Sequence, residues 1–162
     1  MSVRELLRLY SRVLTELIER GVVRSRNAPA GDLAETIVAK AYRGELAAPS
    51  EKCWDVRTAD GVLLQVKCRV VEPGSLRTHV YSPFRSWDFH ACIFVILNSV
   101  TYDTDHAVEV SVDLVKAIAR KSSWVAGHRI TVSQIRGDVG GAVDVTERLR
   151  EAYEALDRLE QT

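Results

Sequence analysis

The sequence predicts an α/β fold in which helices flank a central β-sheet. Amphipathic helical periodicity marks both ends of the chain, within residues 2–20 and again after Asp144. Between them, residues 54–70 alternate as a β-hairpin does, and residues 89–97 are almost continuously apolar, as in a strand covered on both faces. A chain of 162 residues with 46% hydrophobic and 27% charged residues can bury one core, so we predict a single domain over 1–162.

The two ends of the chain differ in charge. Ser2 and Glu5 have the spacing of a capping box at the start of the first predicted helix. Residues 1–44 hold eight Lys/Arg against five Asp/Glu, whereas residues 138–162 hold three Arg against seven Asp/Glu. Because the net charge of the whole chain is zero, composition alone does not indicate a nucleic-acid-binding protein.

A second helix is predicted over residues 32–43. Asp32 starts it and Glu35 follows three residues later, again with the spacing of a capping box. Glu35 also lies on the same side of the helix as Val38 and Tyr42. A carboxylate at that position either completes the cap or points into a cleft for a functional reason, and the helix alone favours the cap.

The predicted hairpin places polar side chains on one face of its second strand. Gln65, Lys67 and Arg69 alternate there with apolar residues of the opposite face, because successive side chains of a strand point to opposite sides. Asp55 lies on the partner strand, and the register decides whether it joins them. A two-residue turn would put Asp55 on the other face, whereas a three-residue loop ending in Gly61 would put it opposite Gln65.

Two loops carry arginines. Residues 72–88 form a long irregular loop that mixes Arg77 and Arg85 with three aromatic side chains. Such a loop suits contacts with phosphates and bases, although aromatic residues in loops also pack beneath them as additional core. An earlier loop carries Arg24 and Arg26, which either hold phosphates or remain solvated.

The rest of the chain predicts a strand over 107–112, a helix over 113–121 and a strand over 129–132. The three cysteines are odd in number and lack zinc-binding spacing, so we expect free thiols in a reducing compartment. The N-terminus has no uncharged signal-peptide core, and no apolar run reaches membrane-spanning length. These features predict a cytoplasmic protein with no membrane partner.

The predicted cluster of Asp55, Gln65 and Lys67 suits phosphate chemistry. A carboxylate and an amide oxygen can hold a hard divalent cation, with waters completing its shell. A lysine beside that ion could orient or deprotonate a water, or stabilise charge on a phosphate. The simpler alternative is an exposed cross-strand salt bridge between Asp55 and Lys67, which contributes little to stability.

The order of these residues resembles the PD-(D/E)xK nuclease superfamily, the restriction-endonuclease-like proteins, and in particular its small bacterial members. The signature is a helical Glu, an Asp on one strand and Glu/Gln-x-Lys on the next, here matched by Glu35, Asp55 and Gln65-Val66-Lys67. The order helix, hairpin, loop and apolar strand also matches, over residues 24–97. The chain departs from the pattern where Trp54 replaces the proline that often precedes the Asp, and where Gln65 replaces the usual acid.

The resemblance implies a restriction-endonuclease-like core with a central mixed sheet, and a site that uses Mg²⁺, with Mn²⁺ as a substitute. Asp55 would be the principal metal ligand, completed by Gln65 and the Val66 carbonyl. Lys67 would act on the water, and Glu35 would help through a bound water or a second ion. The phosphate contacts, expected from charge and position alone, are Arg24, Arg26, Arg69, Arg77 and Arg85.

The function implied by this resemblance is hydrolysis of DNA phosphodiester bonds by a metal-dependent endonuclease of restriction or defence. We expect a homodimer, since cutting a duplex needs two sites, and a methyltransferase or other defence-system partner. A neutral Gln65 binds a metal more weakly than an acid would, so the alternative is a catalytically inactive nuclease-fold subunit that binds DNA or a larger complex. A third candidate is a small interaction protein that docks through its acidic last helix.

Overall fold

The centre of the molecule is a mixed six-stranded sheet. The computed structural model describes residues 1–159, apart from the side chains of Val3, Leu6 and Leu159, so the last three residues of the predicted domain lie outside it. The sheet strands are β1 (Glu45–Leu46), β2 (Val56–Arg57), β3 (Leu63–Val71), β4 (Ala91–Asn98), β5 (Thr104–Ser111) and β8 (Val143–Asp144). They lie in the order β1-β2-β3-β4-β5-β8, and β3 and β4 run parallel while the other neighbours are antiparallel.

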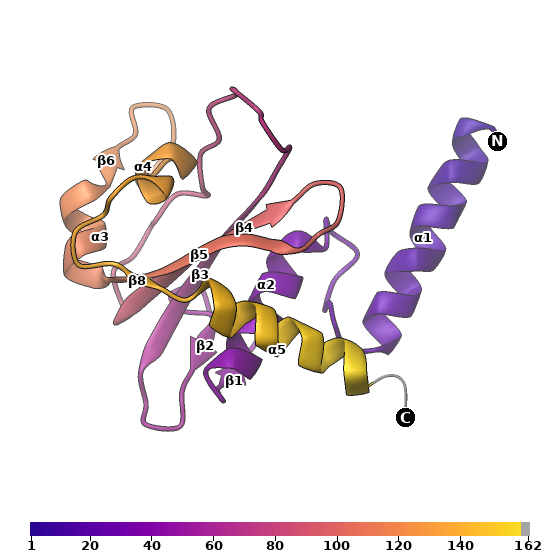
Figure 1. The fold of residues 1–162 in the computed structure, drawn as a ribbon, viewed down its shortest axis with the longest axis horizontal. Helices are drawn as coiled ribbons and strands as arrows, with labels where there is room; N and C mark the ends of the chain where they lie inside the picture. Colours follow the sequence, from indigo (N-terminus) through magenta and orange to yellow (C-terminus); the bar gives the residue numbers. More distant parts are fainter. Residues whose placement is uncertain (160–162) are drawn as a thin grey trace.

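Helices cover both faces of this sheet, which confirms the expected α/β architecture (Figure 1). The helices are α1 (Val3–Glu19), α2 (Ala30–Ala41), α3 (Val112–Ile118), α4 (Val132–Arg136) and α5 (Thr146–Leu159). A separate two-stranded sheet consists of β6 (Arg120–Lys121) and β7 (His128–Arg129).

Each face of the main sheet has its own hydrophobic core. On one face α2 and α5 contribute Ile37 and Leu149, both completely buried. On the other face α3, α4 and the segment 72–88 cover the sheet, and Tyr81 is among the buried residues there. Residues 91–97 of β4 lie between the two layers and are all buried, as their continuous apolar run predicts.

The hairpin of β2 and β3 has the three-residue loop. The N–H of Thr58 donates to the carbonyl of Val62 at 3.0 Å, so three residues turn the chain. The last of them, Gly61, has φ +85°, a conformation that glycine adopts without steric strain. The resulting register brings Asp55 beside Gln65, as the three-residue alternative predicts.

The predicted cap of α2 is wrong. The helix begins at Ala30, directly after a proline that provides no side-chain cap. Asp32 instead accepts a hydrogen bond from the N–H of Arg24 at 2.8 Å, and the Glu35 carboxylate pairs with the Arg24 guanidinium. Long-range partners therefore replace the local capping box, and they leave Glu35 available to the site described below.

The elements after β4 differ most from the prediction. β5 begins at Thr104, three residues earlier than expected, and α3 ends at Ile118, three residues earlier than expected. The strand predicted over 129–132 is divided between β7 and α4. These elements are short and depend on pairing with distant residues, so local periodicity does not reveal them.

The segment 72–88 is irregular, as predicted, but two of its aromatic residues belong to the core. Tyr81 is 1% exposed and Phe84 is 2% exposed, and both contact Phe94 of β4 in edge-to-face geometry. Trp87 is half-buried and stacks on Phe84. The alternative that aromatic residues pack beneath this loop is therefore confirmed for Tyr81 and Phe84.

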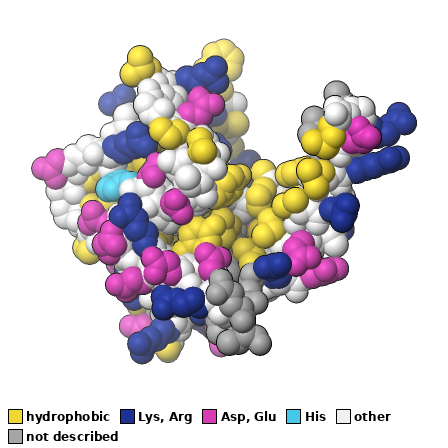
Figure 2. Space-filling view, turned by 45° about the vertical axis from the view of Figure 1, so that its right-hand side comes forward, with side chains coloured by type: hydrophobic (Ala, Val, Ile, Leu, Met, Phe, Trp, Pro, Cys, Tyr) yellow, Lys and Arg dark blue, Asp and Glu magenta, His cyan; other side chains and the backbone are white. Residues whose placement is uncertain are grey.

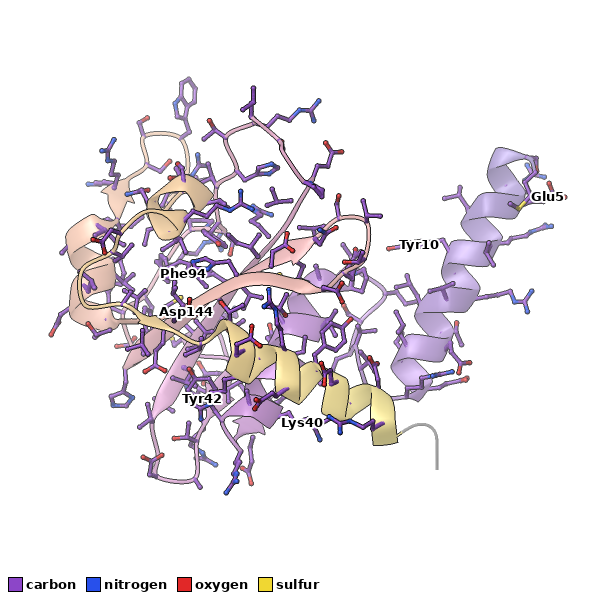
Figure 3. All side chains as sticks on the ribbon, viewed as in Figure 1. Glu5, Tyr10, Lys40, Tyr42, Phe94 and Asp144 are labelled. Atoms are coloured by element: carbon purple, nitrogen blue, oxygen red, sulfur yellow. The ribbon has the colours of Figure 1, made fainter. Side chains whose placement is uncertain are left out.

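Helix α1 projects from the rest of the molecule (Figure 1). Its predicted capping box is confirmed, since the N–H of Glu5 donates to Ser2 Oγ and the N–H of Ser2 donates to Glu5 Oε2. Tyr10 and Val13 remain 47% and 48% exposed, and hydrophobic side chains line the hollow between α1 and the body (Figure 2). Figure 3 shows Tyr10 pointing into that space. The inner side of α1 is thus left open near its N-terminus.

The three cysteines are free thiols, as expected from their number and spacing. Cys53, Cys68 and Cys92 are all free, and Cys92 is completely buried in β4. Within residues 1–159, no helix is both long and apolar enough to cross a membrane.

Candidate active site

The short strand β2 leaves part of β3 without a neighbour, and Asp55 fills the gap. β2 pairs with β3 only up to Leu64, so from Gln65 onward that edge of β3 has no partner strand. Asp55 Oδ2 accepts hydrogen bonds from the N–H of Val66 at 2.7 Å and from Gln65 Nε2 at 2.5 Å. The carboxylate thereby satisfies a backbone group that an edge would leave unpaired.

Oxygen atoms also gather at this edge. The N–H and C=O of one strand residue point to the same side, so the Val66 carbonyl faces the side on which Asp55 lies. Among residues 1–159, no group donates a hydrogen bond to Asp55 Oδ1. Asp55 Oδ1 and the Val66 carbonyl are therefore acceptors on the same side of β3, and the Gln65 side-chain amide, which donates to Asp55 through Nε2, lies beside them.

Lys67 lies beneath the segment 72–88. It is 8% exposed, and its Nζ donates to Ser82 Oγ at 3.0 Å and to the Pro83 carbonyl at 3.4 Å. Nζ also lies 4.8 Å from the ring centroid of Phe84, a cation–π contact. Burial lowers the pKa of Lys67, an effect that the negative charge of Asp55 partly opposes. The alternative of an exposed salt bridge with Asp55 is wrong, because Lys67 is buried and the described residues show no ion pair between them.

Glu35 reaches the same neighbourhood from α2. Its Oε2 pairs with Arg24 Nη2 at 2.6 Å, and Arg24 Nη1 donates to the Ala47 carbonyl at 2.8 Å. Burial, followed by the charge of Asp55, raises the pKa of Glu35 to about 7. Because the charge of Asp55 acts on Glu35, and the charge of Arg24 acts on both carboxylates, we treat the helix and the hairpin as contributing to one site.

The electrostatics of these residues are typical of a functional site. Burial raises the pKa of Asp55, while the hydrogen bond from Val66 and the charge of Lys67 act in the opposite direction. Two carboxylates with raised pKa thus lie near a lysine with a lowered pKa. Such opposed shifts in one partly buried place mark candidate catalytic groups, because each group is held away from its preferred charge state.

The raised pKa of Glu35 predicts a pH-dependent stability. Between pH 4.5 and about 7 the folded protein holds a proton that the unfolded chain has released, so the free energy of unfolding falls as pH rises, by up to about 3 kcal/mol. Glu35→Gln should remove most of this decrease in the free energy of unfolding. A smaller decrease should remain in the variant, because the pKa of Asp55 is also raised. Urea unfolding of both proteins in EDTA, from about pH 5 to about pH 8, measures the difference. A difference that is constant with pH would contradict the assignment.

Three of the predicted phosphate contacts surround the site. Burial is the main cause of the lowered pKa of Lys67, and the positive charges of Arg85 and Arg69 lower it further. Arg69 Nε donates to the Val80 carbonyl at 2.6 Å, which fixes it against the segment 72–88. Arg24 is held in the ion pair with Glu35.

The other two predicted phosphate contacts, Arg26 and Arg77, make no described contact with the site. Arg26 Nη2 donates to Thr15 Oγ1 of α1 at 3.0 Å, and no described contact joins Arg26 to Asp55 or Lys67. Arg77 is exposed within the segment 72–88. No described contact joins either residue to Asp55, Gln65 or Lys67.

Sequence reasoning missed the groups that hold Lys67 and the third carboxylate. Ser82 and Pro83 lie fifteen and sixteen positions beyond Lys67, in a segment without periodicity. Glu51 lies close enough for its charge to raise the pKa of Asp55. No sequence pattern could have identified these partners, because the irregular chain before β2 and after β3 has to fold back onto the hairpin.

The acceptors around Asp55 suit a magnesium ion better than a zinc ion. Mg²⁺ is usually bound through one or two carboxylates together with waters and substrate phosphates. Asp55, the Val66 carbonyl and the Gln65 side chain could meet this requirement, and Glu35 is a further carboxylate in the neighbourhood, paired with Arg24. Within residues 1–159 no three His, Cys, Asp or Glu side chains are arranged to hold a metal, so a cation would depend on neutral oxygens and on its substrate.

Comparisons with known proteins identify no family for this chain. No protein-family model matches the sequence, and no curated protein matches it significantly. The restriction-endonuclease-like identity of the core therefore stays a prediction.

Proposed function

We propose that this protein is a metal-dependent nuclease with a restriction-endonuclease-like core, which hydrolyses phosphodiester bonds of DNA. The observation that carries the proposal is the convergence of Asp55, Gln65 and Lys67 at the open edge of β3, with Glu35 beside them. The order α2, β2–β3 hairpin, irregular segment and β4 also agrees with the order of elements in that superfamily.

The residues divide the chemistry between binding and proton transfer. Asp55, Gln65 and the Val66 carbonyl would hold Mg²⁺, which would lower the pKa of a water and neutralise phosphate charge. Lys67, fixed by Ser82 and Pro83, would orient the attacking water and take its proton. Because burial lowers the pKa of Lys67, its neutral form is more accessible than that of an exposed lysine.

Cleavage of supercoiled plasmid tests the proposal directly. Wild-type protein should nick or linearise the plasmid with Mg²⁺ or Mn²⁺, and EDTA should stop the reaction. Asp55→Asn should slow cleavage by about 10²–10³-fold or more, because the anionic ligand is lost. The asparagine oxygen can still accept from the N–H of Val66, so the hairpin is expected to fold. Asp60→Asn, at the exposed tip of the same hairpin, is the matched control and should cut normally.

Two outcomes would count against this function. Wild-type protein that neither cuts nor binds any form of DNA with either metal would refute it. Cleavage by Asp55→Asn at the wild-type rate would place the reaction elsewhere in the protein.

A catalytically inactive DNA-binding subunit is the second candidate. Gln65 provides no charge to a metal, and the ion pair with Arg24 already neutralises Glu35. This candidate predicts salt-dependent DNA binding without cleavage under any metal. The homodimer, the methyltransferase or defence-system partner and the cytoplasmic location stay predictions.

A further inference from the structure

Although the net charge of the chain is zero, its basic and acidic residues are unevenly distributed. Residues 73–87 and 114–137, together called the basic layer, contain no Asp or Glu. Their seven Lys/Arg residues are Arg77, Arg85, Lys116, Arg120, Lys121, Arg129 and Arg136. Because the whole chain has 22 basic and 22 acidic residues, the remainder of the chain carries seven more acids than bases.

The fold joins the two segments of the basic layer into one surface. The N–H of Phe84 donates to the His128 carbonyl and the N–H of His128 donates back to the Phe84 carbonyl, at 2.8 and 3.0 Å. Val80 forms a second bridge with Thr131. The basic layer therefore covers the sheet face that carries Lys67, on the opposite side from α2 and α5 (Figure 1).

The protein does not neutralise these charges itself. Within residues 1–159, none of the seven basic side chains forms an ion pair with a carboxylate. Like charges gathered on one surface repel one another, and a bound polyanion would relieve that repulsion. The charge distribution thus points to an anionic partner on this face.

A hollow of about 490 Å³ opens in the basic layer beside the β6–β7 hairpin. Arg120, Lys121 and Arg129 line it together with several hydroxyl groups. Trp124, at the tip of the hairpin, also lines the hollow and is 91% exposed. Cations beside an unpacked aromatic ring are the combination that binds a sugar-phosphate chain and stacks on its bases.

The hollow is a short distance from Lys67. Val80 lines the hollow, whereas Ser82 and Pro83 contact Lys67 Nζ. Two or three residues of chain span at most about 7–11 Å, so the hollow and Lys67 lie within the length of a short oligonucleotide. One nucleic-acid strand could therefore lie across both places.

We infer that the hollow beside Trp124 binds single-stranded nucleic acid, with Arg120, Lys121 and Arg129 on its phosphates and Trp124 stacked on an unpaired base. Bases inside a duplex are already stacked on one another, so the exposed indole requires a single strand or an opened end. The inference rests on the proposed function for the class of ligand, and it adds where and in which form that ligand binds.

Binding of a fluorescein-labelled oligodeoxythymidine to the full chain in EDTA tests the inference without cleavage. Trp124→Ala should weaken binding by about 5- to 150-fold, the usual effect of losing the stacking of one base on an aromatic ring. Trp124→Phe keeps an aromatic ring and should retain most of the affinity. Trp54 and Trp87 are half-buried, so quenching of tryptophan fluorescence by the oligonucleotide should largely disappear in Trp124→Phe. Because Trp124 is exposed, neither change should unfold the protein, and thermal melts of both variants check this.

A pair of double variants tests the phosphate contacts. Arg120→Gln with Lys121→Gln should reduce the slope of log affinity against log salt by about 1.4, or about 0.7 for each lost contact. Arg12→Gln with Arg158→Gln removes the same charge from α1 and α5 and should leave the slope unchanged. Equal slopes for the two double variants would overturn the inference, as would wild-type binding by Trp124→Ala.

The inference and the proposed function fail in different ways. Binding that depends on Trp124 in a protein that never cuts would refute the nuclease and keep the inference. Cleavage that depends on Asp55, together with oligonucleotide binding that does not change in Trp124→Ala, would support the nuclease and refute the inference. Binding to anionic phosphatidylserine vesicles, with no affinity for the oligonucleotide, would overturn the inference in favour of a membrane surface.

Discussion

Lys67→Met is expected to abolish most of the cleavage while leaving the protein at least as stable as wild type. Lys67 is 8% exposed, and its ammonium group is held by Ser82 and Pro83 and by the face of the Phe84 ring. Keeping a charge at such a place is unfavourable for folding, as its lowered pKa indicates. Methionine retains a flexible apolar stem that fills the same space, but it can neither transfer a proton nor bind a phosphate.

The cleavage rate and the stability of Lys67→Met together distinguish a catalytic role of Lys67 from a structural one. The plasmid cleavage rate should fall by about 10²–10³-fold, the usual effect of removing one group that stabilises developing charge. The midpoint of urea unfolding should stay the same or rise. Lys40→Met on α2 is the matched control and should change neither value. A variant that cuts normally but unfolds at lower urea would show that Lys67 only supports the segment above it.

The hairpin could be predicted because its register depends on neighbouring residues. The N–H of Thr58 and the carbonyl of Val62 close a loop whose third residue, Gly61, accepts a positive φ. Alternation along the two strands then brings Asp55 to Gln65 with no information from elsewhere in the chain. The capping box at the start of α1 is predictable for the same reason.

The surroundings of the hairpin could not be predicted, because they depend on long-range contacts. Alternation places Lys67 on a polar face and suggests exposure, yet an irregular segment folds back and buries it. Glu35 has the correct spacing for a capping box with Asp32, but Arg24 takes the carboxylates of both residues, one with its guanidinium and one with its backbone N–H. Local patterns describe what a residue can do, and tertiary contacts select among those possibilities.

Part of the basic layer could have been predicted by searching the sequence for long stretches without acidic residues. Comparing the two ends of the chain, 1–44 and 138–162, finds only modest differences of opposite sign. The acid-free stretch 114–137 is visible without a structure, although its proximity to 73–87 is not. Long stretches with charges of one sign are therefore more informative here than net charge.

Gly127→Ala is expected to destabilise the protein by about 2–4 kcal/mol, because it combines backbone strain with a steric clash. Gly127 has φ +133°, a conformation that other residues rarely adopt. An added Cβ would lie 2.5 Å from the Phe84 carbonyl oxygen and 3.1 Å from Pro83 Cβ. The carbonyl cannot move away freely, because it accepts the hydrogen bond from the N–H of His128.

Urea unfolding measures this effect, with Gly31→Ala as the matched control. Gly31 lies in α2 with no atom within 4 Å of an added Cβ, so alanine there should stabilise the protein by up to about 1 kcal/mol. A change below about 0.5 kcal/mol in Gly127→Ala would mean that the β6–β7 hairpin is not fixed against Phe84. If the destabilisation is found, hydrogen exchange should show the amides of Tyr81 and Phe84 opening first, since both donate to residues that follow Gly127. That opening would uncover Lys67, so one glycine on the basic layer would control the burial of the lysine on the sheet.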